Sequence, residues 1–227
     1  MPKTTSQGTC HLCQGTFSKA TMSRHLAKCI PAHLADQPPS DEAASTKAKL
    51  FHLVVQGKDA SVYWLHVDIP ATAALADLDQ FLRHIWLECC GHLSAFTIQG
   101  TIYSVMSHDG MADQDMNVRV GELFRPGLAF THEYDFGSTT MLTLKVVSER
   151  EGPVAKQQAV RLLARNAPPL IPCASCGQPA TGIVMEEAWT PDGWQCAQCL
   201  KKHDYHEEQV LPVVNSPRTG VCGYTGP

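Results

Sequence analysis

The 227-residue chain has a globular composition, with 44% hydrophobic and 18% charged residues and a formal net charge of −4. No apolar run reaches the roughly 18 to 20 residues needed to span a bilayer, so no membrane association is expected. The first residues lack the apolar stretch of a secretion signal, so we expect a cytoplasmic protein. Its ten cysteines then indicate metal ligands, because disulfides are rare in the cytosol.

The charge is unevenly distributed along the chain. Residues 1–35 contain four basic and no acidic residues, whereas residues 50–150 contain six basic and twelve acidic ones. Binding to phosphates requires clustered Lys and Arg. Contact with nucleic acid is therefore expected at the N-terminal end, and the acidic middle would repel it.

The first metal motif lies in residues 8–30 and has the pattern C-x2-C-x3-F-x4-M-x2-H-x3-C. This pattern resembles the ββα zinc finger family in its Cys-Cys-His-Cys form. Phe17 and Met22 would form a small apolar core, and Ser18 would cap the helix. We expect a zinc finger over residues 1–30 that holds one structural Zn²⁺ through Cys10, Cys13, His25 and Cys29.

Two interpretations of the basic residues in this finger stay open. If the helix reads DNA as other fingers do, its base-reading positions fall on Ser18, Thr21 and Arg24. DNA or RNA would then be contacted by Lys19, Arg24 and Lys28. Alternatively, these three bases offset the single net negative charge of a Zn²⁺ ion bound by three thiolates.

The middle of the chain predicts one larger domain. Residues 31–48, rich in Pro, Ala and Ser, predict a linker before a core domain at 49–152. An amphipathic helix is expected at 72–90, a short helical turn at 118–124 and an acidic loop at 107–117. Strands are expected at 50–55, 62–67, 95–98, 101–105, 128–136 and 141–147. These elements predict an α+β fold, in which a central mixed sheet with one main helix is flanked by the ββα zinc finger and a second zinc module.

Residues 153–170 are expected to connect this core domain to the second module. Val160, Leu162 and Ala164 alternate with neighbouring positions, which favours an edge strand. The Lys-Gln-Gln sequence at 156–158 would suit a helix equally well.

The second metal motif contains two Cys-x-x-Cys pairs separated by nineteen residues. Over residues 171–206 it resembles a zinc ribbon or a rubredoxin-like module. We expect a second structural Zn²⁺, with iron as the alternative because four thiolates suit either metal. Its ligands would be Cys173, Cys176, Cys196 and Cys199. The tail at 207–227 is expected to dock on this ribbon or on a protein partner.

Three cysteines remain outside both motifs. Cys89 and Cys90, at the end of the predicted helix, are interpreted as buried thiols. Cys222, in the tail, could be a reactive thiol, although its local charge gives no strong reason for reactivity.

A further resemblance covers residues 50–147, under half of the chain. It rests on Val62-Tyr63-Trp64-Leu65 before Ile69-Pro70, on the helix with Leu75 and Leu78, on His92-Leu93-Ser94-Ala95-Phe96, on Val120-Gly121-Glu122-Leu123-Phe124 and on Tyr134-Asp135-Phe136-Gly137. These segments are similar to the plasmid Ri open-reading-frame-three-like family, also seen in the TnpR passenger protein of an insertion element. The resemblance implies an α+β fold without a settled activity, and its mobile-element contexts imply a role linked to nucleic acid. The family continues Asp-Phe-Gly with Asp and a nearby Trp, where this chain has Ser138, Thr139 and Thr140.

His92, Glu133 and Asp135 are candidates for lining a polar groove in the core domain. In the alternative interpretation Asp135 caps a turn and His92 caps the end of the helix. The sequence contains no Ser-His-Asp order, phosphate loop or open metal site, so an enzyme is not expected. We therefore expect a non-enzymatic zinc-binding protein with nucleic acid as its candidate ligand. The alternatives are a protein–protein adaptor that uses the zinc modules and tail, and an enzyme that uses the polar groove.

Overall fold

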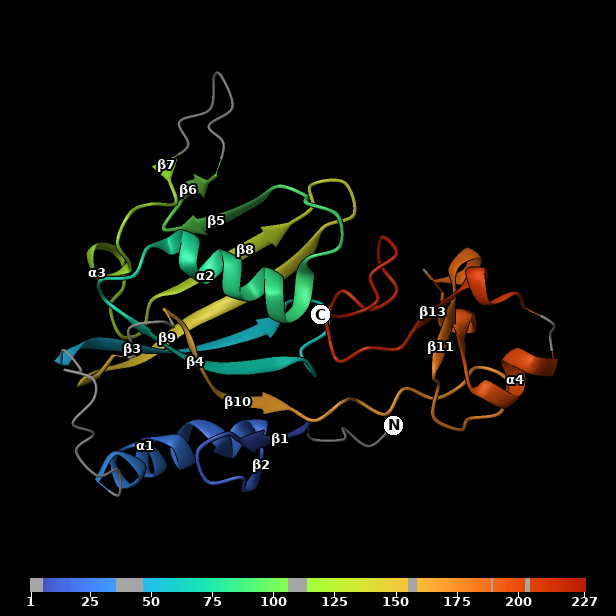
Figure 1. Cartoon of the computed structure of the whole chain (residues 1–227), viewed down its shortest axis with the longest axis horizontal. Helices are drawn as coiled ribbons and strands as arrows, with labels where there is room; N and C mark the ends of the chain where they lie inside the picture. Colours follow the sequence, from blue (N-terminus) through green and yellow to red (C-terminus); the bar gives the residue numbers. More distant parts are fainter. Residues whose placement is uncertain (1–5, 36–46, 106–113, 155–158, 189, 203–204) are drawn as a thin grey trace.

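The computed structural model describes residues 6–35, 47–105, 114–154, 159–188, 190–202 and 205–227. Most of the predicted linker at 31–48, and the first part of the acidic loop at 107–117, lie outside these residues. Within them the chain forms one ten-stranded and one three-stranded sheet (Figure 1). In the described part of the chain, no helix is long and apolar enough to cross a membrane.

The ten-stranded sheet has the order β2-β1-β10-β4-β3-β9-β8-β5-β6-β7. Its pairs are antiparallel except β6–β7, which is parallel, so the sheet is mixed as the sequence predicts. The strands are β1 (Gln7–Cys10), β2 (Thr16–Ser18), β3 (Lys47–Gly57), β4 (Trp64–Pro70), β5 (Ser94–Ile98), β6 (Thr101–Ser104), β7 (Gln114–Asp115), β8 (Ala129–Tyr134), β9 (Thr140–Pro153) and β10 (Arg161–Asn166).

The main helix covers one face of this sheet (Figure 1). It consists of α2 (Leu75–Leu82) and the π-helical turn η1 (Arg83–Leu87), inside the predicted range of 72–90. Leu75, Leu78 and Leu82 are fully buried, which confirms the apolar spacing. Each such side chain contributes about 1.5–3 kcal/mol through burial. A short helix, α3 (Val120–Leu123), closes the same core, as expected for 118–124.

The N-terminal module is part of the large sheet. Strand β1 pairs with β2 on one side and with β10 on the other, and β10 continues to β4. Helix α1 (Lys19–Ala35) follows β2. The expectation of a finger that only flanks the core domain is therefore wrong. The linker boundary also changes, because residues 31–35, which were expected in the linker, continue α1 through Pro31.

Residues 161–166 form a strand, as their alternation favours, but the strand is not at an edge. It lies between β1 and β4, and its register shifts between Leu162 and Ala164. Such a bulge changes which side chains face each side of the sheet. Leu163 and Ala164 consequently pack on the N-terminal module, whereas Val160 and Leu162 pack on the central core.

The C-terminal module has its own three-stranded sheet, in the order β12-β11-β13. It contains β11 (Gly182–Val184), β12 (Trp194–Gln195), β13 (Val210–Pro212), helix α4 (Ala197–Lys202) and the short turns η2 (Met185–Glu187), η3 (Pro191–Gly193) and η4 (Glu207–Gln209). Residues 210–212, expected in the tail, are thus a strand of this sheet.

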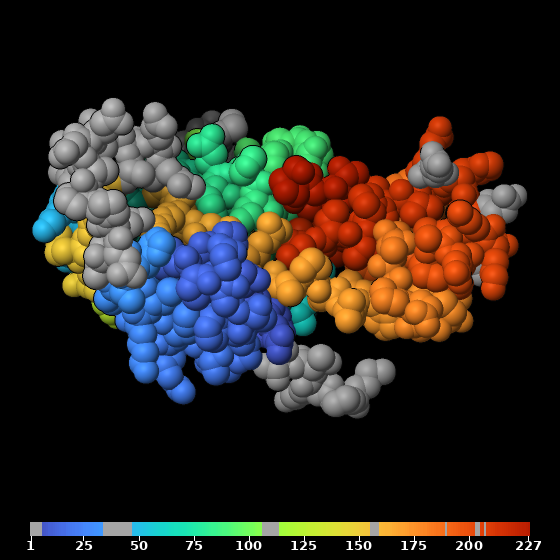
Figure 2. Space-filling model, turned by 60° about the horizontal axis from the view of Figure 1, so that its bottom comes forward, coloured from blue at the N-terminus to red at the C-terminus, as the bar shows by residue number. Residues whose placement is uncertain are grey.

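The tail at 213–227 returns to the central domain, and Figure 2 shows its end, in dark red, against the green part of that domain. Ser216 Oγ donates to the Trp86 carbonyl at 2.6 Å, and Arg165 Nη2 donates to the Asn215 carbonyl at 2.7 Å. Arg218 and Tyr224 are buried. The buried anchors of residues 213–227 lie on the central domain, so the prediction that this segment docks on the ribbon is wrong. Docking on a protein partner stays a prediction.

Candidate metal centres

All ten cysteines of the chain, together with two histidines, lie in three clusters of four donors. The N-terminal cluster is Cys10, Cys13, His25 and Cys29, and the C-terminal cluster is Cys173, Cys176, Cys196 and Cys199. The third, here called the tail cluster, is Cys89, Cys90, His92 and Cys222. In each cluster the donor atoms lie within 4.8 Å of one another, so each could hold a metal ion. The sequence predicts the first two clusters and misses the third.

A tetrahedral zinc site gives a reference for these distances. With Zn–S bonds of about 2.3 Å and Zn–N bonds of about 2.0–2.1 Å, adjacent sulfur atoms lie about 3.8 Å apart. A sulfur and a nitrogen on the same ion lie about 3.6 Å apart.

The N-terminal cluster is formed by a turn that follows β1 and by one face of α1. The turn is closed by the Cys10 backbone, whose N–H donates to the Gly15 carbonyl and whose carbonyl accepts from Gln14. The donor distances are 3.9 Å between the Cys10 and Cys29 sulfurs and 3.4 Å between Cys13 Sγ and His25 Nε2. Both values are close to the tetrahedral reference.

An apolar core supports this cluster from the central-domain side. Met22, Leu26 and Ile30 on α1 are buried against Trp64 and Leu163. Met22 therefore has its predicted core role. Phe17 is only partly buried, and its ring stacks on His25 at a centroid distance of 3.7 Å, which holds the imidazole in place.

The three basic residues of this module have different environments. Lys19 Nζ donates to the Ser61 carbonyl at 2.8 Å, so this side chain lies between the module and the central domain. Burial lowers the pKa of Lys19. Arg24 and Lys28 are exposed on α1. Of the three predicted nucleic-acid contacts, only these two are free of a contact with the central domain among the described residues.

The C-terminal cluster joins two tight turns. The first is closed by the Gly177 N–H, which donates to the Cys173 carbonyl at 2.8 Å, and Gly177 has a left-handed φ of 75° that favours glycine. The second follows β12 and enters α4, which carries Cys199. The sulfurs of Cys176 and Cys196 are 3.6 Å apart.

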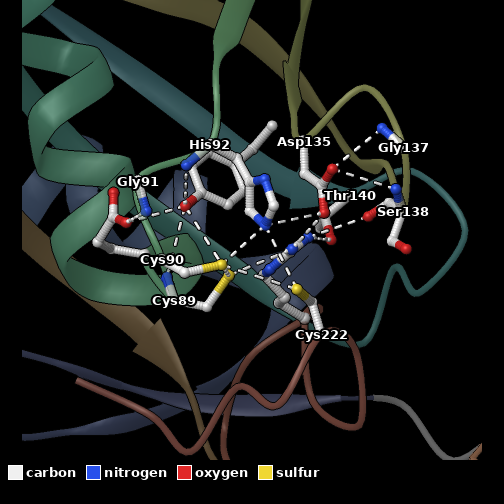
Figure 3. A network of polar contacts seen from close by, with 12 residues as sticks. Cys89, Cys90, Gly91, His92, Asp135, Gly137, Ser138, Thr140 and Cys222 are labelled. Atoms are coloured by element: carbon white, nitrogen blue, oxygen red, sulfur yellow. Dashed lines mark hydrogen bonds and ion pairs between the residues drawn. The ribbon is translucent and has the colours of Figure 1, made fainter.

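The tail cluster lies where the loop between η1 and β5 meets the tail (Figure 3). Cys89 and Cys90 follow η1, His92 precedes β5, and Cys222 lies in a tail turn with a left-handed φ of 50°. The sulfur of Cys90 is 3.5 Å from that of Cys89 and 3.8 Å from that of Cys222. His92 Nε2 is 2.9 Å from Cys90 Sγ and 3.3 Å from Cys222 Sγ.

A buried ion pair lies behind the tail cluster. The fully buried Arg218 donates from Nη2 to Asp135 Oδ2 at 2.7 Å and to Cys89 Sγ at 3.4 Å. Its Nη1 donates to Ser138 O and Thr140 Oγ1. Burial would raise the pKa of Asp135, but the Arg218 guanidinium holds it below its usual value.

The predicted groove residues are only partly brought together. His92 Nε2 lies 3.4 Å from Asp135 Oδ2. Glu133 is not in this network, because strand alternation places it on the opposite face from the buried Tyr134. The interpretation of Asp135 as a turn cap is confirmed, since its Oδ1 accepts from the Gly137 and Ser138 N–H groups. The interpretation of His92 as a helix cap is not, since its ring nitrogen contacts the thiols.

The backbone at Asp135 interrupts the strand predicted over residues 128–136. Strand β8 ends at Tyr134, and Asp135 has a left-handed φ of 65°. Alternation stops there, so Tyr134 is buried while Phe136 is 51% exposed. The strand expected over 128–136 therefore ends two residues earlier, at Tyr134.

Thiol crowding is common to the three clusters. One thiol in each has a pKa raised to about 12: Cys29 mainly through burial, and Cys90 and Cys199 mainly through hydrogen bonds to neighbouring thiols. Burial would also raise the pKa of Cys173, but backbone N–H groups of Cys196, Cys176 and Ser175 lower it to about 6. Donors packed this closely resist full ionisation unless a cation lies among them.

Sequence reasoning missed the tail cluster because its donors are separated by up to 133 positions in the chain. One local signal was present, in the sequence Cys89-Cys90-Gly91-His92, which places three donors within four residues. The second signal was the number of cysteines. After those of the N-terminal and C-terminal clusters are assigned, three cysteines remain, and one of them lies in a tail without low-complexity character.

Comparisons with known proteins give little further information. No family model matches this chain, and no curated protein matches it. Among solved structures it is similar to a protein of unknown function, MM3350, from Methanosarcina mazei Go1, with 16% sequence identity and a TM-score of 0.41. The similarity covers 49% of this chain and 65% of that protein, so the chain spans just under two thirds of its length. No function follows from this similarity.

Proposed function

We propose that this chain is a non-enzymatic zinc-binding protein, whose N-terminal and C-terminal clusters each hold one structural Zn²⁺. The observation that supports this proposal is the convergence of four soft donors in each cluster at distances near those of a tetrahedral site. Four protein ligands leave no coordination position for a substrate, which is typical of structural rather than catalytic zinc.

The donor sets also bear on the choice of metal. The N-terminal cluster combines three thiolates with an imidazole, a set that zinc binds well. The four thiolates of the C-terminal cluster would also accept iron. Zinc sites are colourless, whereas iron bound by four thiolates absorbs visible light. The visible spectrum of the purified protein therefore distinguishes the two metals.

We propose further that α1 contacts the phosphate backbone of nucleic acid through Arg24 and Lys28. Both side chains are exposed, and they belong to a segment with four basic and no acidic residues. Lys19 has no part in this proposal, because it is bound to Ser61. Two cations that contact phosphates would give affinity without sequence selection.

The test is the binding of a labelled DNA duplex and a labelled single-stranded RNA, measured by fluorescence anisotropy between about 50 and 200 mM salt. Binding should weaken with salt, and Arg24→Ala/Lys28→Ala should reduce the slope of log affinity against log salt by up to about two. Lys201→Ala/Lys202→Ala, on the exposed face of α4, removes the same charge elsewhere and is the matched control. Absence of binding at low salt, or an equal loss in the control, would sink this proposal.

The adaptor alternative is less favoured by the contacts of the tail. Residues 213–227 are anchored on their own central domain through Ser216, Arg218 and Tyr224. A partner surface on the C-terminal module stays a prediction. The similarity of residues 50–147 to the plasmid Ri open-reading-frame-three-like family also stays a prediction, as does a cytoplasmic location.

A further inference from the structure

The tail cluster has the composition and spacing of a metal site that the sequence motifs do not reveal. We infer that it is a third binding site for a thiophilic divalent cation such as Zn²⁺. Cys90, His92 and Cys222 supply three donors, and Cys89 supplies the fourth. This inference goes beyond the two structural zinc sites proposed above and does not depend on them.

The distances between the donor atoms are close to those of a zinc site. The Cys90–Cys222 and Cys89–Cys90 sulfur separations are 3.8 and 3.5 Å, against about 3.8 Å for a tetrahedral zinc site. The His92–Cys222 separation is 3.3 Å, against about 3.6 Å for nitrogen and sulfur. The N-terminal cluster shows separations of 3.9 and 3.4 Å between the same kinds of donor. The His92–Cys90 separation is shorter, at 2.9 Å, so the imidazole would have to shift by several tenths of an ångström to share an ion with that sulfur. The other separations are close to those of the N-terminal cluster, whose sequence motif predicts zinc.

The donors on the central-domain side are held in place by a buried tyrosine. The Tyr134 hydroxyl accepts the backbone N–H of Cys89 at 3.4 Å and that of His92 at 3.3 Å. It also donates to Glu88 Oε1 at 3.0 Å. One hydroxyl thus fixes the loop that carries three of the four donors. A preformed loop of this kind lowers the entropy lost when a metal binds.

The fourth donor is brought to this loop by independent contacts of the tail. Arg218 and Tyr224, on either side of Cys222 in the sequence, are both buried. The Arg218 guanidinium also lies over the Tyr134 ring, 4.8 Å from its centroid. The position of Cys222 is therefore set by packing on both sides and does not result from a free chain end.

The charge around the cluster suits a cation bound by thiolates. A divalent ion with three thiolates and one imidazole has a net single negative charge. Arg218 places a buried positive charge 3.4 Å from Cys89 Sγ, and the same nitrogen, Nη2, donates to Asp135 Oδ2, which anchors the guanidinium. An N–H donor directed at a ligand sulfur is a common outer-shell contact of metal sites.

Exposure separates this site from the other two. Two thiols of the tail cluster, Cys90 and Cys222, are exposed, and none of its four donors is buried. Each of the other clusters has one exposed thiol, Cys13 or Cys176, and at least one buried thiol. Water and chelators can reach the tail cluster directly. Its metal should therefore exchange faster than the two others.

The experiment compares zinc content and zinc release in the full-length chain, purified under reducing conditions with Zn²⁺ and then freed of loosely bound metal. The wild type should hold three ions, and Cys222→Ser and His92→Asn should each hold one fewer. Val221→Ala changes the adjacent tail residue without removing a donor and should keep three. A colorimetric chelator should remove one ion from the wild type in a fast phase that Cys222→Ser lacks. Unchanged circular dichroism on heating would show that the variants are folded.

Equal zinc content in the wild type and both variants would overturn the inference. A Cys90–Cys222 disulfide in protein purified without oxygen would overturn it too, because the thiols would then be unavailable to metal. These outcomes are distinct from failure of the proposed function. Two ions in the wild type and in all three variants would remove only the tail site, whereas fewer than two in the wild type would contradict the structural zinc sites.

Discussion

The N-terminal and C-terminal modules have similar ligand chemistry but are attached to the rest of the molecule differently. Strand β1 extends the ten-stranded sheet through β10, and helix α1 buries Met22 and Leu26 against Trp64 of the central domain. The C-terminal module has its own small sheet, and the hydrophobic cluster around its ligands consists of three of the cysteines themselves. If both clusters hold metal as proposed, the metal reinforces an existing core in the first module and replaces a missing one in the second.

The comparison has an energetic consequence. A structural Zn²⁺ contributes on the order of 10 kcal/mol to the folding of a small module. In the N-terminal module, a shared apolar core adds to that contribution. In the C-terminal module, few other interactions take its place, so loss of the metal should unfold the module while leaving the main sheet intact.

The largest expected effect is therefore that of Cys173→Ser. The variant should lose one metal and about 10 kcal/mol of local stability, so that the C-terminal module unfolds. Hydrogen exchange should show lost protection at residues 171–202 and 205–212 and retained protection in β3 and β9. Gln198→Ala, an exposed change between two ligands, is the control. Lost protection throughout the main sheet would show that the module is not independent.

Cys10→Ser should have a smaller effect that reaches further. Loosening α1 would expose Met22, Leu26 and Ile30, each worth about 1.5–3 kcal/mol when buried, for a total of about 4.5–9 kcal/mol. Because β1 pairs with β10, faster hydrogen exchange should spread into β10 and towards β4. If exchange in β10 is unchanged, the N-terminal module is as separate as the C-terminal one, and the comparison fails.

Arg218→Met tests the link between the tail and the central domain. The change leaves Asp135 buried without its cationic partner and should cost about 3–5 kcal/mol in urea unfolding. The double variant Arg218→Met/Asp135→Asn should recover part of this loss, because Asn tolerates the left-handed backbone and carries no charge. If the losses of stability from the two substitutions simply add in the double variant, the ion pair contributes little to stability.

The smallest expected effect concerns a histidine pair in the central sheet, away from both metal modules' ligands. His52 Nε2 and His66 Nδ1 are 2.9 Å apart, and burial lowers their pKa values to about 4 and about 3. An unfolded histidine has a pKa near 6.5, so this contribution to stability is complete above that pH and is lost as the pH falls towards 4. Each histidine should lower the free energy of unfolding by about 1.4 kcal/mol for each pH unit of decrease in that window.

The measurement is the free energy of unfolding at pH values from 7.5 to 5. His66→Gln, which removes one titrating group, should show a shallower decrease than the wild type. Metal release at low pH affects both proteins equally, so only the difference between them is used. Parallel curves would contradict the buried neutral pair.

Local patterns predicted much of the fold. The apolar spacing of Leu75, Leu78 and Leu82 predicted α2, and β-rich runs predicted the central strands. Three Cys-x-x-Cys spacings and one His-x-x-x-Cys spacing identified eight donors that the structure brings together as two clusters. In these cases the residues that decide the structure are close in sequence, so periodicity and spacing were sufficient.

The remaining features depend on which distant segments meet. The alternation at residues 160–165 predicted a strand but not its position between β1 and β4, because a strand pattern does not specify its neighbours. Cys222 lies near Cys90 because the buried Arg218 and Tyr224 fix the tail on the central domain, and the sequence alone does not show this. The tail cluster is therefore a product of tertiary packing, and no local rule predicts it.

The central claim is that ten cysteines and two histidines form three soft-metal sites. Native mass spectrometry of the full-length chain, purified under reducing conditions with Zn²⁺, tests it most directly. The account predicts a mass equal to the chain plus three Zn²⁺, with all ten thiols reduced yet protected from alkylation until the metal is removed. Two or fewer bound ions, or a disulfide among these cysteines, would contradict it.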